Sequence, residues 1–192
     1  MNIQPPSHPA LFLDRDGVIN REAGYITNTD GIEFMEHIFE ICRFFKDQLY
    51  KIVVITNQSG IGRGIISQAQ YNEINSFIID KFKSENCSID LILTATIDPT
   101  NNANNKEEAY LRKPNPGMIL KAELELNLDL NRSVLIGDNL SDMQAGRNAL
   151  ISRLYLIKNP PVYSEFFESF ADLKSCLVRL KSAIGSSRYI HG

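Results

Sequence analysis

The chain has 192 residues, 43% of them hydrophobic and 22% charged, and a formal net charge of −3 at pH 7. This composition is typical of a globular protein with one sizeable core, and it excludes a largely disordered or fibrous chain. The acidic balance argues against broad nucleic-acid binding, which needs a basic surface. No apolar run approaches the length of a membrane span, and no basic region and long apolar run of the signal-peptide kind opens the chain. We therefore expect one cytoplasmic domain over residues 1–192, with its core at 9–184 and a disordered tail at 185–192.

Three cysteines, Cys42, Cys87 and Cys176, lie far apart and form no Cys-x-x-Cys pair. An odd number of widely spaced cysteines does not fit a disulfide framework. Two of them fall on apolar helix faces, so we expect small buried side chains in a reducing compartment.

Short apolar runs alternate with amphipathic segments along the chain. Strands are predicted at 10–13, 52–55, 90–95, 134–136 and 154–157. Helices are predicted at 33–49, 68–83, 114–126, 142–148 and 166–183. Strands that alternate with helices form a parallel sheet covered on both faces, so we expect an α/β fold of three layers.

Local signals refine three of these segments. Ser67 is placed to cap the helix predicted at 68–83. Leu49 continues the apolar stripe of the first predicted helix, which makes it a candidate core residue. Residues 98–105 are polar and rich in turn-forming types, so we expect a mobile loop there.

The stretch 10–20 is the most informative part of the chain. It begins as a buried strand and ends in two carboxylates one residue apart, Asp14 and Asp16, followed by Gly17, which permits a sharp turn. Ligands of α/β sheets bind at the carboxyl ends of strands. Taken alone, however, this pair also fits a solvated strand end with an Asx turn.

Further polar side chains are expected at the same edge of the sheet. Thr56 and Asn57 follow the second predicted strand, and Asp138 follows the fourth. Arg112 and Lys113 supply two cations. Hard oxygen ligands for Mg²⁺, hydroxyl and amide groups, and cations around one point favour phosphoryl transfer.

The two carboxylates of the first strand suit a covalent route. A carboxylate such as Asp14 can attack phosphorus and form an aspartyl-phosphate. Asp16 is then placed to protonate the leaving oxygen and afterwards to activate water.

Each part also has an ordinary structural explanation. Lys113 could be a solvated loop charge, and Thr56-Asn57 could be an ordinary transition from strand to loop. Asp138 and Asp142 could cap a short helix. The glycines at 60, 62 and 64 suggest a phosphate loop, but the Lys-Ser/Thr of the Walker pattern is absent, which favours a flexible loop. Four such coincidences in the right order are jointly improbable.

With these motifs the chain resembles the haloacid dehalogenase superfamily of phosphatases. The resemblance is carried by the motifs at 14–18, 56–60, 112–114 and 137–142. Other pieces look like the branch of D-glycero-D-manno-heptose-1,7-bisphosphate phosphatases, namely those at 24–25, 61–64, 113–118 and 142–145. The histidinol-phosphate phosphatases share much of this pattern, and the similarity covers roughly residues 9–160.

The resemblance implies a Rossmann-like core and a set of site residues. Asp14 would be the nucleophile and Asp16 the general acid/base. Both would hold Mg²⁺ together with Asp138, with Asp16 contributing its backbone carbonyl. Thr56 and Lys113 would hold the transferring phosphoryl group. The substrate pocket would be lined by Glu22, Ala23, Gly24, Tyr25, Asn57, Gln58, Ser59 and Arg112.

The spacing of the motifs argues against a large cap domain. Only 40 residues separate Asp16 from Thr56, and 57 separate Thr56 from Lys113. A strand and helices use most of both intervals, so only the loop at 96–111 could partly close the site.

The sequence departs from the heptose-bisphosphate pattern in two places. Many members carry a Cys/His zinc loop before the Arg-Lys-Pro motif, whereas residues 94–111 hold neither Cys nor His. We therefore expect Mg²⁺ and no zinc. Asn139 stands where these enzymes usually place a lysine, so one cation near the metal is missing.

The resemblance thus implies a phosphatase that removes the 7-phosphate of heptose 1,7-bisphosphate. The expected partner is a small phosphosugar, with no nucleic acid and no membrane, and the expected state is a monomer. The alternatives are a histidinol-phosphate phosphatase or other small-molecule phosphomonoesterase, a polynucleotide 3′-phosphatase, and a non-catalytic phosphosugar-binding paralogue.

Overall fold

The computed structural model describes residues 7–98, 100 and 106–185. It contains a parallel sheet of six strands in the order β3-β2-β1-β4-β5-β6. The strands are β1 (Ala10–Leu13), β2 (Lys51–Asn57), β3 (Leu91–Ala95), β4 (Val134–Gly137), β5 (Arg153–Ile157) and β6 (Glu168–Phe170). The expected α/β fold with a central parallel sheet is confirmed.

The side chains of the central strands point alternately into two separate hydrophobic cores, one on each face of the sheet. In β1, Leu11 and Leu13 pack with one cluster, whereas Ala10 and Phe12 pack with the other. Successive side chains of a strand point to opposite faces, so an unbroken apolar run is what a sheet covered on both sides requires.

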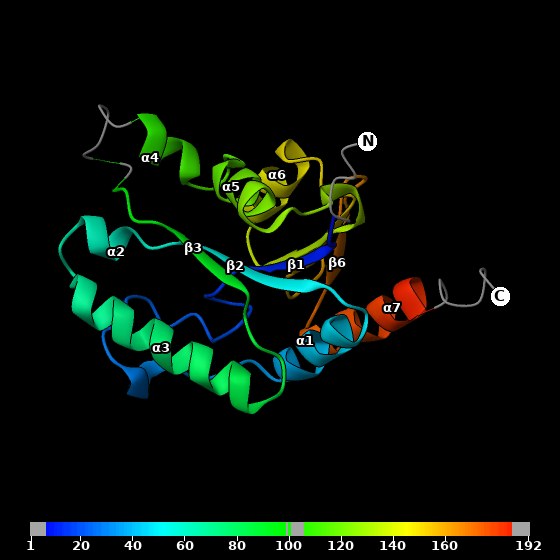
Figure 1. The fold of residues 1–192 in the computed structure, drawn as a ribbon, viewed down its shortest axis with the longest axis horizontal. Coiled ribbons are helices and arrows are strands. Elements are labelled where there is room, and N and C mark those ends of the chain that lie inside the picture. The colour runs from blue at the N-terminus through cyan, green and yellow to red at the C-terminus, as the bar shows by residue number, and fades with distance from the viewer. Residues whose placement is uncertain (1–6, 99, 101–105, 186–192) are drawn as a thin grey trace, which may run out of the picture.

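Helices form the two outer layers (Figure 1). One layer consists of α1 (Ile38–Asp47), α3 (Gln68–Ser84) and α7 (Leu173–Gly185). The other consists of α4 (Lys106–Leu111), α5 (Gly117–Leu126) and α6 (Leu140–Asn148). The short α2 (Ser59–Gly62) follows β2, and two 3-10 turns lie at Thr29–Gly31 and Leu130–Arg132. No cap domain interrupts the described stretches 14–50 and 58–90.

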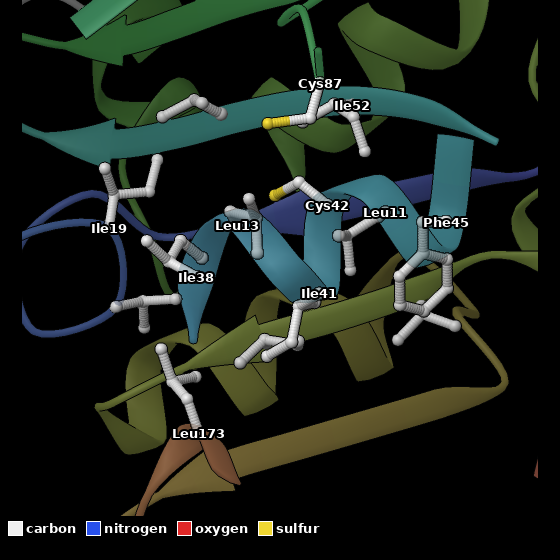
Figure 2. Close-up of a cluster of buried hydrophobic side chains, with 14 of the residues drawn as sticks. Leu11, Leu13, Ile19, Ile38, Ile41, Cys42, Phe45, Ile52, Cys87 and Leu173 are labelled. Atoms are coloured by element: carbon white, nitrogen blue, oxygen red, sulfur yellow. The ribbon is translucent and has the colours of Figure 1, made fainter. Parts of the chain in front are cut away.

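Several local predictions are confirmed. Ser67 caps α3 through a capping box with Gln70. All three cysteines are buried. Figure 2 shows Cys42 and Cys87 as neighbours within one of the two hydrophobic cores. Within the described residues, none of the helices combines the length and apolar character needed to span a bilayer.

Other predictions were wrong in instructive ways. The first helix begins at Ile38 rather than 33, because the preceding segment pairs with the β1 loop through Met35 N–H and Ile19 O at 2.9 Å. Leu49 is 80% exposed in a left-handed conformation after the helix ends. The range 166–183 begins with strand β6, and the helix starts only at Leu173.

The polar segment 98–105 is only partly described. Asp98 is buried rather than part of a solvated loop, and a helix, α4, occupies the end of the predicted loop at 96–111. The expected mobility of 99 and 101–105, and the expected disorder of 186–192, concern segments outside the described residues. Gly185 ends α7.

Candidate active site

The strand order reverses between β1 and β4, which lie side by side at the middle of the sheet. Ligands of such sheets bind at the carboxyl ends of the strands beside this switch point. Asp14 follows β1, and its N–H extends the ladder by donating to Ile136 O at 3.0 Å. Asp138 follows β4. The fold therefore brings these two carboxylates together.

Gly17 makes the close approach of the two loops possible. Its φ is +82°, and a Cβ at this position would lie 2.1 Å from Asp138 Oδ2. Any side chain here would displace the Asp138 carboxylate as well as strain the backbone.

A polar cavity of about 250 Å³ opens at this edge of the sheet. Eight of the residues that the sequence placed in the site line it: Asp14, Asp16, Glu22, Thr56, Asn57, Arg112, Lys113 and Asp138. Asn139 and Ser141 line it as well. Five other predicted residues do not line it: Ala23, Gly24, Tyr25, Gln58 and Ser59.

Lys113 is the buried centre of the site, with a side chain only 3% exposed. Its Nζ lies 2.8 Å from Asp14 Oδ1 and 2.6 Å from Asp142 Oδ1, and it donates to Ile55 O at 3.1 Å. The two carboxylates raise the pKa of Lys113 against the opposing effect of burial. The cation is therefore fixed beside Asp14 by three partners.

Burial raises the pKa of the two carboxylates at the switch point. The pKa of Asp14 rises to about 7, although the nearby Lys113 opposes the shift. The pKa of Asp138 rises to about 6, and the nearby Asp142 adds to the shift. One cation, Lys113, thus stands among three carboxylates, and the excess of negative charge suits a further cation.

Carboxylate oxygens of Asp14, Asp138 and Asp142 lie within 4.8 Å of one another. Hard oxygen donors at this spacing fit Mg²⁺, which takes carboxylates and keeps waters for the remaining positions. The residues present therefore fit a magnesium ion. Asp142 was not among the metal ligands expected from the sequence, although the Asp138-x-x-x-Asp142 spacing could have suggested it.

Asp16 is held by several donors. Arg15 binds it with a bidentate fork, through Nη2 to Oδ2 at 2.8 Å and Nε to Oδ1 at 3.1 Å. Asn20 Nδ2 donates to Oδ1 at 3.0 Å and Gln58 Nε2 to Oδ2 at 2.7 Å. Arg15 and Gln58 thus hold the Asp16 carboxylate in place without lining the cavity themselves. This role of Arg15 was not predicted from the sequence.

Asn57 ties the end of β2 to the loop that carries Lys113. Its Nδ2 donates to Lys113 O, and its Oδ1 accepts from Lys113 N–H, both at 3.1 Å. Thr56 is buried, and its Oγ1 accepts from Gln58 Nε2 at 2.9 Å. These bonds fix the position of the cationic loop relative to the sheet.

Arg112 borders the cavity beside Lys113. Its Nη1 is buried and has no hydrogen-bond partner among the described residues. An unpaired buried donor costs roughly 1–3 kcal/mol, so this atom is available to an anion that enters the cavity.

The chain is similar to proteins that are named as phosphatases. Residues 110–154 match a family model described as "HAD-hyrolase-like". The chain is 40% identical over 168 residues to D-glycero-alpha-D-manno-heptose-1,7-bisphosphate 7-phosphatase of Campylobacter jejuni, which covers 88% of this chain and 93% of the relative. It is 34% identical over 185 residues to the corresponding beta-heptose phosphatase of Yersinia pestis, which covers 95% of this chain and 98% of that relative.

Solved structures share the fold. A haloacid-dehalogenase-like protein of Mesorhizobium loti superposes with a TM-score of 0.81 at 32% identity, covering 97% of this chain and 90% of that one. A D,D-heptose 1,7-bisphosphate phosphatase of B. bronchiseptica, in complex with magnesium and phosphate, gives a TM-score of 0.79 at 23% identity, covering 91% and 99%.

Proposed function

The chain belongs to the haloacid dehalogenase superfamily of phosphatases, and from this we propose that it removes the 7-phosphate of D-glycero-D-manno-heptose 1,7-bisphosphate through an aspartyl-phosphate on Asp14. The observation that carries the proposal is Asp14 paired with the buried Lys113 at the cavity wall, 2.8 Å away. The names of the relatives at 34–42% identity support the substrate.

The chemistry follows from the positions of two carboxylates. Asp14 attacks phosphorus, the bond from phosphorus to the sugar oxygen breaks, and Asp16 gives that oxygen a proton. Asp16 then takes a proton from water, which attacks the aspartyl-phosphate and releases inorganic phosphate. In the proposed step, Asp16 Oδ2 gives up the hydrogen bond that it accepts from Gln58 Nε2 and takes up one with the leaving oxygen. Thr56 and Lys113 hold the phosphoryl oxygens.

Magnesium completes the proposed site. Asp14, Asp138 and the Asp16 carbonyl would hold it, with Asp142 close by. When bound, the ion supplies positive charge for the phosphoryl oxygens.

We expect EDTA to abolish phosphate release and added Mg²⁺ to restore it. Binding to the folded state alone also raises the melting temperature by mass action, so Mg²⁺ should stabilise the EDTA-treated protein in a thermal melt. Elemental analysis should find no stoichiometric zinc. One tightly bound zinc per chain would contradict this expectation, which rests on the lack of Cys and His in residues 94–111.

The proposed orientation puts the slimmer end of the substrate into the cavity. The primary 7-phosphate sits on a slim arm that can reach Asp14 in a site of about 250 Å³. The 1-phosphate then lies toward the rim, where Arg112 can form a bidentate pair with it.

Arg112→Ala should lower kcat/KM for the bisphosphate tenfold to hundredfold, because a hydrogen bond to a charged group contributes about 1.5–3 kcal/mol. The loss on a sugar monophosphate should be far smaller, because that substrate has no rim phosphate. The measurement is kcat/KM for both substrates with both proteins. Equal losses would favour a monophosphatase.

A phosphate-release screen tests the function itself. Its substrates are both anomers of the heptose bisphosphate, because the named relatives divide between them, together with histidinol phosphate and a 3′-phosphorylated oligonucleotide. Phosphorus NMR of the product identifies which phosphate is lost. Highest kcat/KM on histidinol phosphate, or retention of the 7-phosphate, would refute the proposal.

A further inference from the structure

A second cation, Arg63, lies close enough to Arg112 to lower the pKa of its guanidinium, although it does not line the cavity itself. Arg63 follows α2, and its guanidinium lies between two side chains from other loops. Its Nε is 3.3 Å from Asp98 Oδ1, and its Nη1 donates to the Tyr25 hydroxyl at 3.2 Å. Three segments that follow β1, β2 and β3 therefore meet at this guanidinium.

The position of Arg63 is fixed by the backbone around it. Its N–H donates to Ser59 O at 3.0 Å, which ends α2. Gly62 N–H donates to Thr96 O at 3.1 Å, and a Cβ on Gly62 would lie 2.3 Å from that oxygen. Only glycine allows α2 to dock this closely on the segment after β3.

Its acidic partner is fixed as well. Asp98 has a side chain only 5% exposed. Its Oδ1 accepts from Thr100 N–H at 2.9 Å and from the Thr100 hydroxyl at 2.8 Å. The Tyr25 ring packs on Gly60, where a Cβ would lie 2.7 Å from the ring. Arg63 is thus held from both sides, with a side chain 37% exposed.

The cluster of Arg63, Arg112 and Asp98 has an excess of positive charge. Asp98 is the carboxylate that acts electrostatically on both Arg63 and Arg112. Burial and the nearby Arg63 both lower the pKa of Arg112, while Asp98 opposes them. Together with the unpaired Arg112 Nη1, this positive charge favours one more negative group near the two guanidiniums.

We propose that Arg63 is a specificity-determining residue, which with Arg112 binds the phosphate that remains on the sugar. Planar guanidinium groups bind phosphate oxygens in pairs. Asp98 and Tyr25 act as positioning residues, since they hold Arg63 in place without contacting the substrate. The inference rests on the proposed bisphosphate substrate, and it adds a second cation to the one that the sequence suggested.

The alternative is a surface ion pair that only ties two loops together. Arg63→Gln separates the two cases, with Arg43→Gln as a matched control. Arg43 also pairs with a carboxylate, since its Nη1 lies 3.1 Å from Glu85 Oε2. It lies on α1, and neither residue of this pair lines the cavity. The assays are kcat and KM for heptose 1,7-bisphosphate and for p-nitrophenyl phosphate, and inhibition by the monophosphate product.

The wild-type protein is assayed first. If it releases no phosphate from the bisphosphate, the proposed function fails and this inference with it. If it does, Arg63→Gln should raise KM for the bisphosphate about tenfold and weaken product inhibition by a similar factor. Its effect on p-nitrophenyl phosphate should be much smaller, and Arg63→Lys should recover part of the loss.

Two further results sharpen the outcome. If both arginines bind one phosphate, the losses of Arg63→Gln and Arg112→Ala should not multiply in the double variant. Asp98→Asn should weaken product inhibition in the same direction as Arg63→Gln. Equal losses on both substrates, or product inhibition at the wild-type level in Arg63→Gln, would overturn the role of Arg63 while the proposed function stands.

Discussion

Asp14→Asn should abolish turnover and leave the fold intact. The amide has the shape of the carboxylate but cannot attack phosphorus or offer a metal a negative charge. Loss of a nucleophile from a covalent mechanism costs orders of magnitude, so we expect kcat to fall by at least about a thousandfold. The measurement is phosphate release under saturating substrate and Mg²⁺.

Stability should change little in this variant. Burial raises the pKa of Asp14 to about 7, so the folded protein without metal already disfavours the charged form. Lys113 keeps its ion pair with Asp142. Asp80→Asn, an exposed position on α3, controls for the loss of a charge. Release by Asp14→Asn near the wild-type rate, with the variant intact by mass spectrometry, would refute the covalent mechanism.

The sheet and the edge that carries the site could be predicted because the strands are buried on both faces. Phe12 and Leu13 belong to opposite cores, so the whole run had to be apolar. The polar residue that follows such a run is conspicuous. This is why Asp14, Thr56 and Asp138 could be assigned to one edge from the sequence alone.

The parts that escaped prediction depend on tertiary contacts. Strand β6 has three residues, all exposed or partly buried, and leaves no alternating pattern. No sequence pattern pointed to Arg15, which is buried as the partner of Asp16. The Arg63–Asp98 pair joins loops 35 positions apart, and only the docking of α2 on the segment after β3 brings them together.

Asp142 lies within a motif that was recognised in the sequence, yet one of its two roles could not be predicted either. The sequence allowed it to be a helix cap, and the Asn139 N–H does donate to its Oδ2 at 3.0 Å, closing a capping box at the start of α6. Its other oxygen faces Lys113. One carboxylate thus starts a helix and neutralises a buried cation, and spacing alone could not reveal the second role.

Lys113→Met should lower both stability and activity, because methionine fills the space but leaves the carboxylates of Asp14 and Asp142 without a counter-ion. Asp142 is only 1% exposed. Removing one partner of a buried ion pair costs about 3–5 kcal/mol. For a chain of this size each kcal/mol shifts the melting temperature by about 2–4 °C, so we expect a Tm lower by roughly 6–20 °C in thermal melts.

The loss of stability in Lys113→Met should be larger at high pH than at low pH. Burial already raises the pKa of Asp14 to about 7, and Lys113 opposes that shift, so removing the lysine raises the pKa further. A carboxyl whose folded pKa exceeds its unfolded value of about 4 loses stability as pH rises between the two. The Tm difference between Lys113→Met and wild type should therefore be larger at pH 8 than at pH 5, measured without metal.

Two further variants test whether the buried charges cause the loss of stability in Lys113→Met. Lys181→Met removes an exposed lysine that pairs with Glu40 at 2.9 Å, and a surface pair of this kind contributes only about 0–1 kcal/mol. Adding Asp142→Asn to Lys113→Met removes one of the orphaned charges, so the double variant should regain part of the lost Tm. It should stay inactive, because the cation beside Asp14 is still missing. If Lys113→Met melts like wild type at both pH values, the buried charge pair does not stabilise the fold, and the lysine serves the phosphoryl group alone.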